Sequence, residues 1–137
     1  MCLVYKKQTK KLCDVMECLS LQTKEIFDFI TDTFSDMPEY LFLDSDTAVF
    51  RKGTRKKWYA VVMTIPKRKL GINSDEIIEV LNIKLSPNDV ALLVDHKGFF
   101  PAYHMNKKHW CTIVLANIVD TNYICYLIEQ SYNLVKG

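Results

Sequence analysis

Residues 57–65, KWYAVVMTI, form a nine-residue run of largely aromatic and β-branched side chains, and this run constrains the fold more than any other stretch. Such a composition is typical of a β-strand, which at about 3.3 Å per residue would be roughly 30 Å long. Its two faces differ, because Tyr59, Val61, Met63 and Ile65 alternate onto the more uniformly apolar one. A strand of this length needs partner strands, and we expect one of its faces to pack against helices.

Other segments of similar composition supply the predicted partners. They are residues 40–43 (YLFL), 47–52 (TAVFRK) and 76–85 (EIIEVLNIKL), followed later in the chain by 110–115 (WCTIVL). Turn residues separate the first three strands: Asp44 to Asp46 precede one strand, and Gly53 precedes another. The first four strands therefore predict an antiparallel meander.

Helical patterns flank these strands. Apolar residues recur at helical spacing over 23–34, with Thr23 as the expected N-cap, and over 120–135, with Asp120 as the cap. The sequence SPND predicts a third helix, from Ser86 as N-cap to about Lys97. The order α-β-β-β-β-α-β-α predicts an α+β two-layer sandwich, an antiparallel sheet with helices packed on one face.

The chain of 137 residues, 49% of them hydrophobic, has the size of one domain. We place that domain at residues 21–137 and treat 1–20 as an N-terminal extension, in which Leu12, Val15, Met16 and Leu19 favour a short helix. No apolar run reaches the roughly 18–20 residues needed to cross a bilayer. Five cysteines without a CxxC pair indicate reduced thiols, so we expect a soluble, cytoplasmic protein that does not bind membranes.

Charge is distributed unevenly along the chain. Residues 1–46 carry five basic and nine acidic side chains, residues 75–137 carry five and seven, and residues 47–74 carry eight basic side chains and no acidic one. This clustering predicts a polyanionic partner, because each phosphate neutralised by Lys or Arg releases condensed counterions. The eight basic residues are Arg51, Lys52, Arg55, Lys56, Lys57, Lys67, Arg68 and Lys69.

These basic residues surround two turns that lie at opposite ends of the strand 57–65. A single compact patch is therefore not expected, and a DNA duplex would have to be straddled by the two tips. The competing interpretation is that basic hairpin tips improve solubility and deter edge-to-edge pairing of strands.

The stretch PAYHMNKKHW, residues 101–110, supplies a third candidate contact. Lys107 and Lys108 would bind phosphate, while His104, Asn106 and His109 would orient the loop or donate hydrogen bonds. Alternatively, Asn106 supplies a turn conformation and Trp110 anchors the following strand in the core. We favour the structural interpretation for Trp110 and the binding interpretation for the two lysines.

Signatures of an enzyme are missing from the sequence. There is no GxGxxG, P-loop or HExxH motif, and His104 and His109 are five residues apart, which is not a helical metal-ligand spacing. Ser131, Cys111 and Asp95 could form a catalytic group only if folding brought them together. We therefore expect a protein without enzymatic activity, metal or cofactor.

The segments KWYAVVM, NIKLSPNDVALL, PAYHMNKKHWCTIVL and LIEQSYNLV together resemble the MmcQ/YjbR-type family of small bacterial proteins, over about residues 21–135. The resemblance implies a compact two-layer fold with an antiparallel sheet, similar to frataxin-like and secretion-chaperone-like folds. It also implies DNA binding, the function commonly assigned to the family on structural grounds.

The fold comparisons keep two other functions open. A frataxin-like protein would present an acidic helix, here Glu25, Asp28, Asp32 and Asp36, to iron or to a partner, although such a stripe is also an ordinary solvated face. A chaperone-like protein would bind another protein or form a homodimer. Our leading hypothesis is binding to double-stranded DNA through the eight basic residues and the 101–110 loop.

Overall fold

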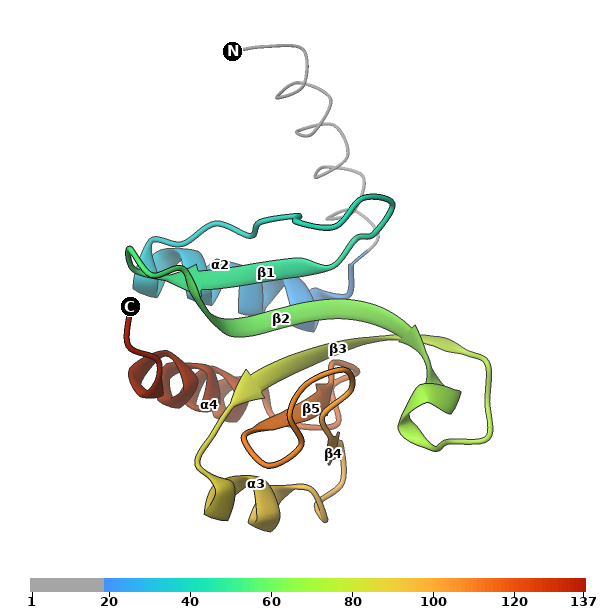
Figure 1. Ribbon diagram of the computed structural model, residues 1–137. Coiled ribbons are helices and arrows are strands. Elements are labelled where there is room, and N and C mark those ends of the chain that lie inside the picture. Colours follow the sequence, from blue (N-terminus) through green and yellow to red (C-terminus); the bar gives the residue numbers. More distant parts are fainter. Residues whose placement is uncertain (1–18) are drawn as a thin grey trace.

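The computed structural model describes residues 19–137, and the expected helix within residues 1–20 lies almost entirely outside them. The elements, in chain order and labelled as in Figure 1, are α2 (Leu21–Phe34), β1 (Ala48–Lys52), β2 (Lys57–Pro66), the 3-10 helix η1 (Lys67–Leu70), β3 (Ile77–Lys84), α3 (Pro87–Leu93), β4 (Phe99–Pro101), β5 (Trp110–Val114) and α4 (Thr121–Leu134). Within residues 19–137, no helix is both long and apolar enough to span a bilayer.

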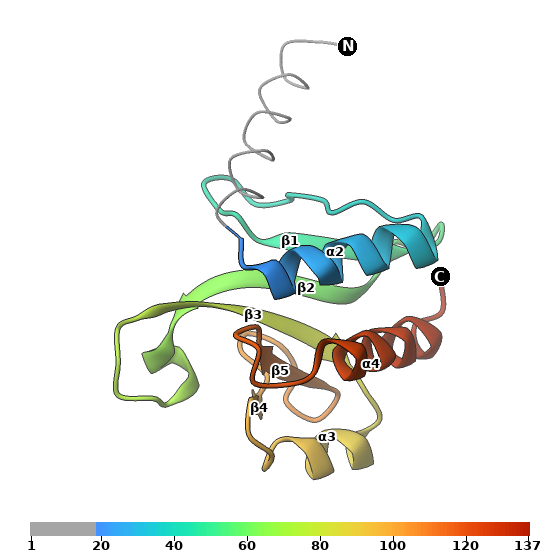
Figure 2. The same ribbon diagram turned by 180° about the vertical axis from the view of Figure 1, so that it is seen from behind.

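The five strands form one antiparallel sheet in the order β1-β2-β3-β5-β4. Helices α2 and α4 lie side by side on one face of this sheet, as Figure 1 and Figure 2 show from opposite sides. Ile30 of α2 and Ile128 of α4 are completely buried in the core beneath them, together with Leu81 and Ile83 of β3. The predicted α+β class, with an antiparallel sheet and helices on one face, is confirmed.

Local capping rules explain where the helices begin. Ser86 and Asp120 cap α3 and α4 as predicted, by accepting hydrogen bonds from the backbone N–H groups three residues ahead, at 3.3 and 3.2 Å. The N-cap of α2 is Ser20 rather than the expected Thr23, whose hydroxyl instead donates to Glu79 Oε1 on β3. The predicted third helix was too long, since α3 ends at Leu93 and turns fill the remainder.

The strand order differs from the prediction at two places. Residues 40–43 are not a strand, because Tyr40 packs against the core and Phe42 packs edge-on against Trp58, leaving Leu43 95% exposed. The ladder there is reduced to one bridge, between Glu39 and Val49. The strand that the sequence did not reveal is β4, which is three residues long and ends in a proline that an edge strand tolerates.

A bulge between β1 and β2 changes which face Tyr59 occupies. Phe50 pairs with Ala60 and Arg51 pairs with Trp58, so Tyr59 is the extra residue. Its side chain turns into the helix-covered core, where the hydroxyl donates to Asp36 Oδ2 at 2.5 Å, and burial together with this bond raises the pKa of Tyr59. The prediction that Tyr59 shares a face with Val61 was therefore wrong.

The second face of the sheet carries a smaller apolar cluster. Ile65, Val80 and Val114 are buried there, and Leu70 of η1 and Tyr103 of the 102–109 loop pack against them. On this face, η1 and the 102–109 loop cover the sheet, whereas α2 and α4 cover the other face.

Candidate nucleic-acid interface

Two of the predicted basic site residues, both on β1, are engaged within the protein. Arg51 forms an ion pair with Glu39 through its guanidinium. The ammonium of Lys52 donates to the carbonyl of Tyr132 at 2.9 Å and lies 4.1 Å from the centre of the Tyr132 ring. Lys52 therefore holds the C-terminal part of α4 against β1, where a cation also suits the negative end of the helix.

The η1 segment carries three further basic residues, Lys67, Arg68 and Lys69, at the far end of β2 (Figure 1). Lys67 pairs with Glu76 at 3.2 Å and Arg68 pairs with Asp75 at 2.7 Å, while Lys69 is exposed. Exposed ion pairs contribute only about 0–1 kcal/mol and can open, but the two carboxylates offset the local positive field. Among the described residues, η1 is thus a weaker attractor of anions than its sequence indicates.

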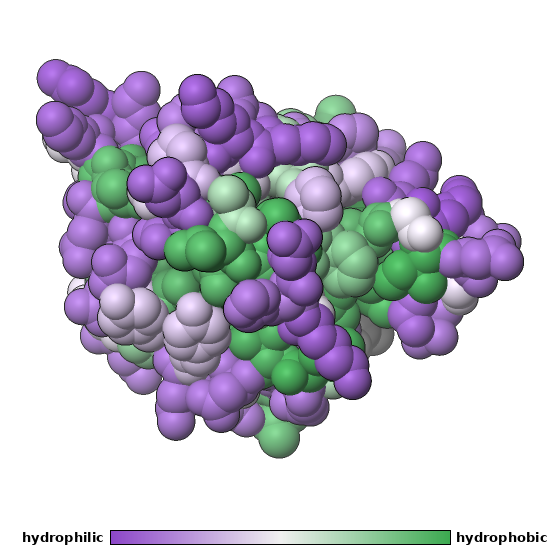
Figure 3. All heavy atoms as spheres, turned by 90° about the horizontal axis from the view of Figure 1, so that it is seen from below, coloured by the Kyte–Doolittle hydropathy of each residue, from purple (hydrophilic) through white to green (hydrophobic). Residues whose placement is uncertain are grey.

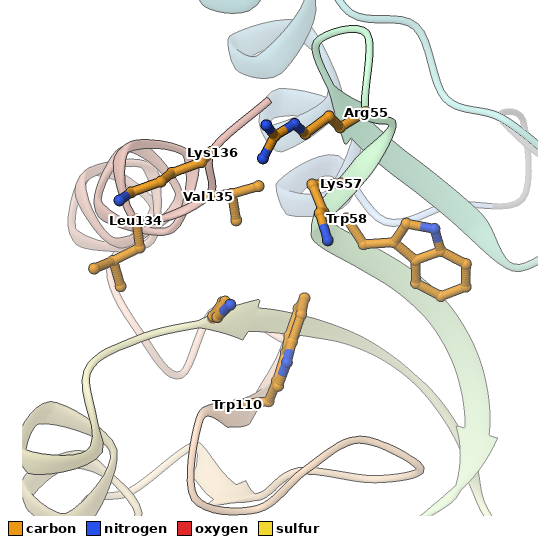
Figure 4. A pocket seen from close by; sticks show the side chains of 8 residues that line it. Arg55, Lys57, Trp58, Trp110, Leu134, Val135 and Lys136 are labelled. Carbon is orange, nitrogen blue, oxygen red and sulfur yellow. The ribbon is translucent and has the colours of Figure 1, made fainter.

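The turn between β1 and β2 carries Arg55, Lys56 and Lys57 on the surface. Gly53 and Lys56 both have positive φ angles, of 68° and 54°, which makes the turn tight. Arg55 and Lys57 border a pocket of about 430 Å³ between this turn and the end of α4, shown in Figure 4. We call it the basic pocket; its lining residues are Arg55, Lys57, Trp58, Lys84, Trp110, Leu134, Val135 and Lys136.

Sheet pairing brings the distant parts of the basic pocket together. Lys84, at the end of β3, is the register partner of Trp110, at the start of β5. Ser131 on α4 joins β2 and β3 to the helix, since its buried hydroxyl donates to the carbonyl of Tyr59 at 2.6 Å and accepts from the backbone N–H of Lys84 at 2.9 Å. The walls of the pocket are therefore fixed by backbone and buried hydrogen bonds.

The charge of the basic pocket is of one sign. Four of the lining side chains are cationic, and within the described chain none of the lining residues is Asp or Glu. The C-terminal end of α4 borders the pocket and would repel an anion, but Lys52 is hydrogen-bonded to a carbonyl in that last turn. Like-charged side chains around one concave surface focus the positive field and attract anions.

The 102–109 loop is tied to the sheet by a buried polar network. Asn82 and Thr112 are completely buried and hydrogen-bonded to one another; Asn82 Nδ2 donates to the carbonyl of Tyr103, and the Tyr103 N–H donates to Thr112 Oγ1, at 2.9 and 3.0 Å. Buried side-chain networks of this kind rigidify a structure when every member has a partner. The loop is therefore an ordered part of the fold.

Several predicted contacts in this loop instead have structural partners. Asn106 closes a turn by accepting from the N–H of Lys108 at 2.8 Å, as the structural interpretation expected, and Lys107 donates to the carbonyl of Ala102 at 2.8 Å. His104 has a positive φ angle of 60° and its ring packs on Tyr103, while His109 is half-buried. Lys108 is exposed, but none of the five predicted loop residues lines the basic pocket.

The structure thus unites part of the predicted site and adds to it. Arg55 and Lys57 meet in the basic pocket, whereas Lys67, Arg68 and Lys69 lie at the other end of β2. The residues that the sequence analysis missed are Trp58, Lys84 and Lys136. The one signal for Lys84 was its position at the end of a predicted strand, next to a helix cap, and nothing local connected it with the turn at Gly53.

The structure gives less support to a metal site on the acidic helix or to a reactive cysteine than to an anion site. Glu25, Asp28 and Asp32 are exposed on α2, but Asp36 lies beyond its end and accepts the hydrogen bond from Tyr59. Within residues 19–137, no group of three or more His, Cys, Asp or Glu side chains is arranged to hold a metal ion. Burial raises the pKa of the Cys111 thiol to about 12, which keeps it protonated and unreactive.

Comparisons with known proteins place these features in a family. The YjbR family model matches residues 32–134, and the uncharacterized protein YyaQ of Bacillus subtilis is 33% identical over 117 residues, or 85% of this chain and 99% of YyaQ. The chain belongs to the YjbR family. The uncharacterized YjbR protein of Escherichia coli K12 is 36% identical over 53 residues, which are 38% of this chain and 45% of that protein.

Solved structures agree with this assignment. The crystal structure of a Pseudomonas syringae protein superimposes with a TM-score of 0.80 at 36% identity, covering 86% of this chain and all of that protein. A Deinococcus radiodurans protein gives a TM-score of 0.56 at 28% identity over 73% of this chain and 67% of its own. The fold that we describe is thus one that solved relatives of this YjbR-family chain also adopt.

The segments that carried the family resemblance have clear structural roles here. In SYNLV, Ser131 joins α4 to β2 and β3, and the Tyr132 ring stacks on Phe34 with centroids 3.9 Å apart. In NKKHW, the Asn106 carbonyl accepts from the N–H of Trp110 at 2.9 Å, and Trp110 begins β5. From these segments of the YjbR-family chain, Trp110, Leu134 and Val135 line the basic pocket.

Proposed function

We propose that the basic pocket and the adjoining β1–β2 turn of the protein bind the phosphate groups of DNA, without selecting a base sequence. The observation that carries the proposal is the convergence of four cations, Arg55, Lys57, Lys84 and Lys136, on one concave surface. Lysine and arginine contacts to phosphate position a protein on DNA and carry no sequence information. The exposed side chain of Lys56 extends this surface along the turn.

The remaining predicted contacts lie outside the basic pocket and would be secondary to it. Lys69 and Lys108 are exposed, and Lys67 and Arg68 could reach phosphate by exchanging their carboxylate partners. Arg51 and Lys52 are left out of the proposed contact set, because Glu39 and the Tyr132 carbonyl already hold them. The proposal thus centres on one end of the sheet rather than on two equal tips.

The test is the fluorescence anisotropy of a labelled DNA duplex of about 20 base pairs, titrated with protein at several salt concentrations. Four phosphate contacts would give a slope of log affinity against log salt of about −3.6, at roughly −0.9 per contact. Saturable binding that weakens steeply with salt is the expected result. Absence of binding at ~50 mM salt, where phosphate contacts are strongest, would refute the proposal.

Protein interaction is a second candidate, favoured by a groove between α3 and α4 that is lined by leucines and tyrosines together with Asp89 and Gln130. The groove has a volume of about 230 Å³, and its lining includes Leu92, Tyr123 and Tyr126, which are 68%, 41% and 56% exposed. Figure 3 shows hydrophobic side chains gathered on the face seen from below, between hydrophilic ones. Sedimentation equilibrium tests the homodimer form of this candidate, and a monomer at all concentrations would remove it.

A further inference from the structure

Both tryptophans of the chain, Trp58 and Trp110, line the basic pocket. Trp58 is half-buried on β2 and Trp110 is 9% exposed at the start of β5. In Figure 4 the Lys57 side chain lies above the Trp110 indole, Arg55 lies above Lys57, and the Trp58 indole extends to the side opposite the end of α4. Phosphate binding alone requires no aromatic side chain, so the two indoles call for a separate explanation.

Packing holds each indole in place. The ring of Trp58 lies 6.1 Å from that of Phe42, nearly perpendicular at 76°. The backbone of Trp110 is held by its pairing with Lys84 across β3 and β5 and by the hydrogen bond from its backbone N–H to the Asn106 carbonyl, and burial of the residue confines its ring. Because these rings are already ordered, a flat ligand that stacks on them costs little additional side-chain entropy.

Fixed aromatic faces beside cations match the chemistry of a nucleotide. Successive bases of single-stranded nucleic acid stack on aromatic side chains while Lys and Arg follow the phosphates. The volume of about 430 Å³ lies within the roughly 300–1,000 Å³ of small-ligand sites, so the pocket has room for one nucleotide. In a duplex, by contrast, both faces of each internal base are already stacked on neighbouring pairs.

We infer that the basic pocket takes an unpaired base together with its phosphate, so that single-stranded DNA binds more tightly than duplex DNA. This inference rests on the proposed function and adds the ligand class. The base stacks on Trp58, the more exposed of the two indoles, and Arg55, Lys57, Lys84 and Lys136 hold the phosphates on either side. Every base has a flat face, so the preference is for unpaired strands and not for a sequence.

The test uses the full chain with a twelve-nucleotide oligothymidylate and, separately, a twelve-base-pair duplex, each at the same salt concentration. Affinities come from the anisotropy of labelled DNA, and intrinsic tryptophan fluorescence is recorded with unlabelled DNA. Because the chain has only these two tryptophans, any quenching reports on the basic pocket. We expect quenching by the oligothymidylate and an affinity at least about fivefold above that for the duplex.

Two variants at Trp58 separate stacking from folding. Trp58→Ala should weaken oligothymidylate binding about 5- to 160-fold, which corresponds to the ~1–3 kcal/mol per base found when an aromatic stacking platform is truncated. Trp58→Phe retains an aromatic face and should recover most of that loss. Tyr126→Ala, which removes an exposed aromatic from the α3–α4 groove, is the matched control and should change neither affinity.

The outcomes distinguish this inference from the proposed function. Equal affinities for the single strand and the duplex, with tryptophan fluorescence unchanged, would overturn the stacking inference and leave phosphate binding standing. If the wild-type protein bound neither the oligothymidylate nor the duplex, both proposals would be overturned. A preference for the single strand that survives undiminished in folded Trp58→Ala protein would also overturn the inference, because stacking would then take place elsewhere.

Discussion

Replacing Arg55 and Lys57 together with alanine should reduce DNA binding by an amount that the geometry allows us to estimate. Both side chains line the basic pocket and are exposed, and within the described residues neither forms an ion pair or a side-chain hydrogen bond. The fold should therefore tolerate their loss. If the four pocket cations each contact one phosphate, the double variant retains two contacts, and the slope of log affinity on log salt should change from about −3.6 to about −1.8.

The same arithmetic gives the loss of affinity. The two lines of log affinity against log salt differ in slope by about 1.8 and are taken to meet at about 1 M salt, where the electrostatic contribution vanishes. The double variant should therefore bind the duplex roughly 60-fold more weakly than the wild type at about 0.1 M salt, and roughly 9-fold more weakly at about 0.3 M salt. Fluorescence anisotropy at five or more salt concentrations measures both quantities, and circular dichroism checks the fold. The matched control is Arg68→Ala with Lys69→Ala, which removes the same charge at η1, where Arg68 is already paired with Asp75.

The control should weaken binding less than about threefold at 0.1 M salt, because its residues lie at the far end of β2. Equal losses in the two double variants would mean that net charge, and not the basic pocket, attracts the DNA. An unchanged salt slope in the Arg55 and Lys57 variant would refute the reasoning directly, since it would show that neither residue contacts phosphate.

Three further predictions concern the residues that hold this structure together. Ser131→Ala leaves the N–H of Lys84 and the carbonyl of Tyr59 without their buried partner, so the free energy of unfolding in urea should fall by about 1–3 kcal/mol; an unchanged value would mean that water replaces the hydroxyl. Cys111, whose pKa burial raises to about 12, should be alkylated by iodoacetamide at pH 8 only after denaturation, and mass spectrometry that finds it modified in the native protein would contradict its burial. Burial and, to a smaller extent, the nearby Asp46 charge raise the pKa of Tyr40 from 10.0 to about 12, so the protonated phenol stabilises the folded protein fully below pH 10 and this stabilisation is lost between pH 10 and 12. The melting temperature of the wild type should therefore fall more steeply over that pH range than the melting temperature of Tyr40→Phe. Parallel curves for the two proteins would count against the shift.

The elements that the sequence predicted are those governed by local rules. Ser86 and Asp120 cap helices because a short polar side chain can satisfy the free N–H groups of the first turn wherever it precedes a helical pattern. The long strand from Lys57 follows from its β-branched and aromatic composition. Such features depend on neighbours within a few residues, so they can be read without knowledge of the fold.

The features that were missed depend on contacts between distant segments. Residues 40–43 have the composition of a strand, but Tyr40 and Phe42 pack against the core and Trp58 instead of pairing. The bulge at Tyr59 places its ring in the helix-covered core, where it contacts Phe34 and Tyr132. Neither the bulge nor the three-residue strand β4 has a local signature that periodicity could detect.

The positive charge of the candidate site could be predicted from the sequence, but the set of residues that form the site could not. The excess of basic residues in 47–74 predicted a positively charged surface, because charge is a property of the sequence. The division of that surface depends on which cations find carboxylates, as Arg51 does with Glu39 and Arg68 with Asp75. Lys84 joins the site because β3 pairs with both β2 and β5.

The most direct measurement of the central claim is a heteronuclear NMR titration of isotope-labelled protein with the twelve-nucleotide oligothymidylate. Trp58 and Trp110 each give one indole N–H signal, and both lie in the basic pocket. We predict that these two signals and the backbone amides of Lys57 and Lys84 shift most, while those of η1 stay near their free positions. Large shifts confined to η1 or to the groove between α3 and α4, with both indole signals unmoved, would contradict the account.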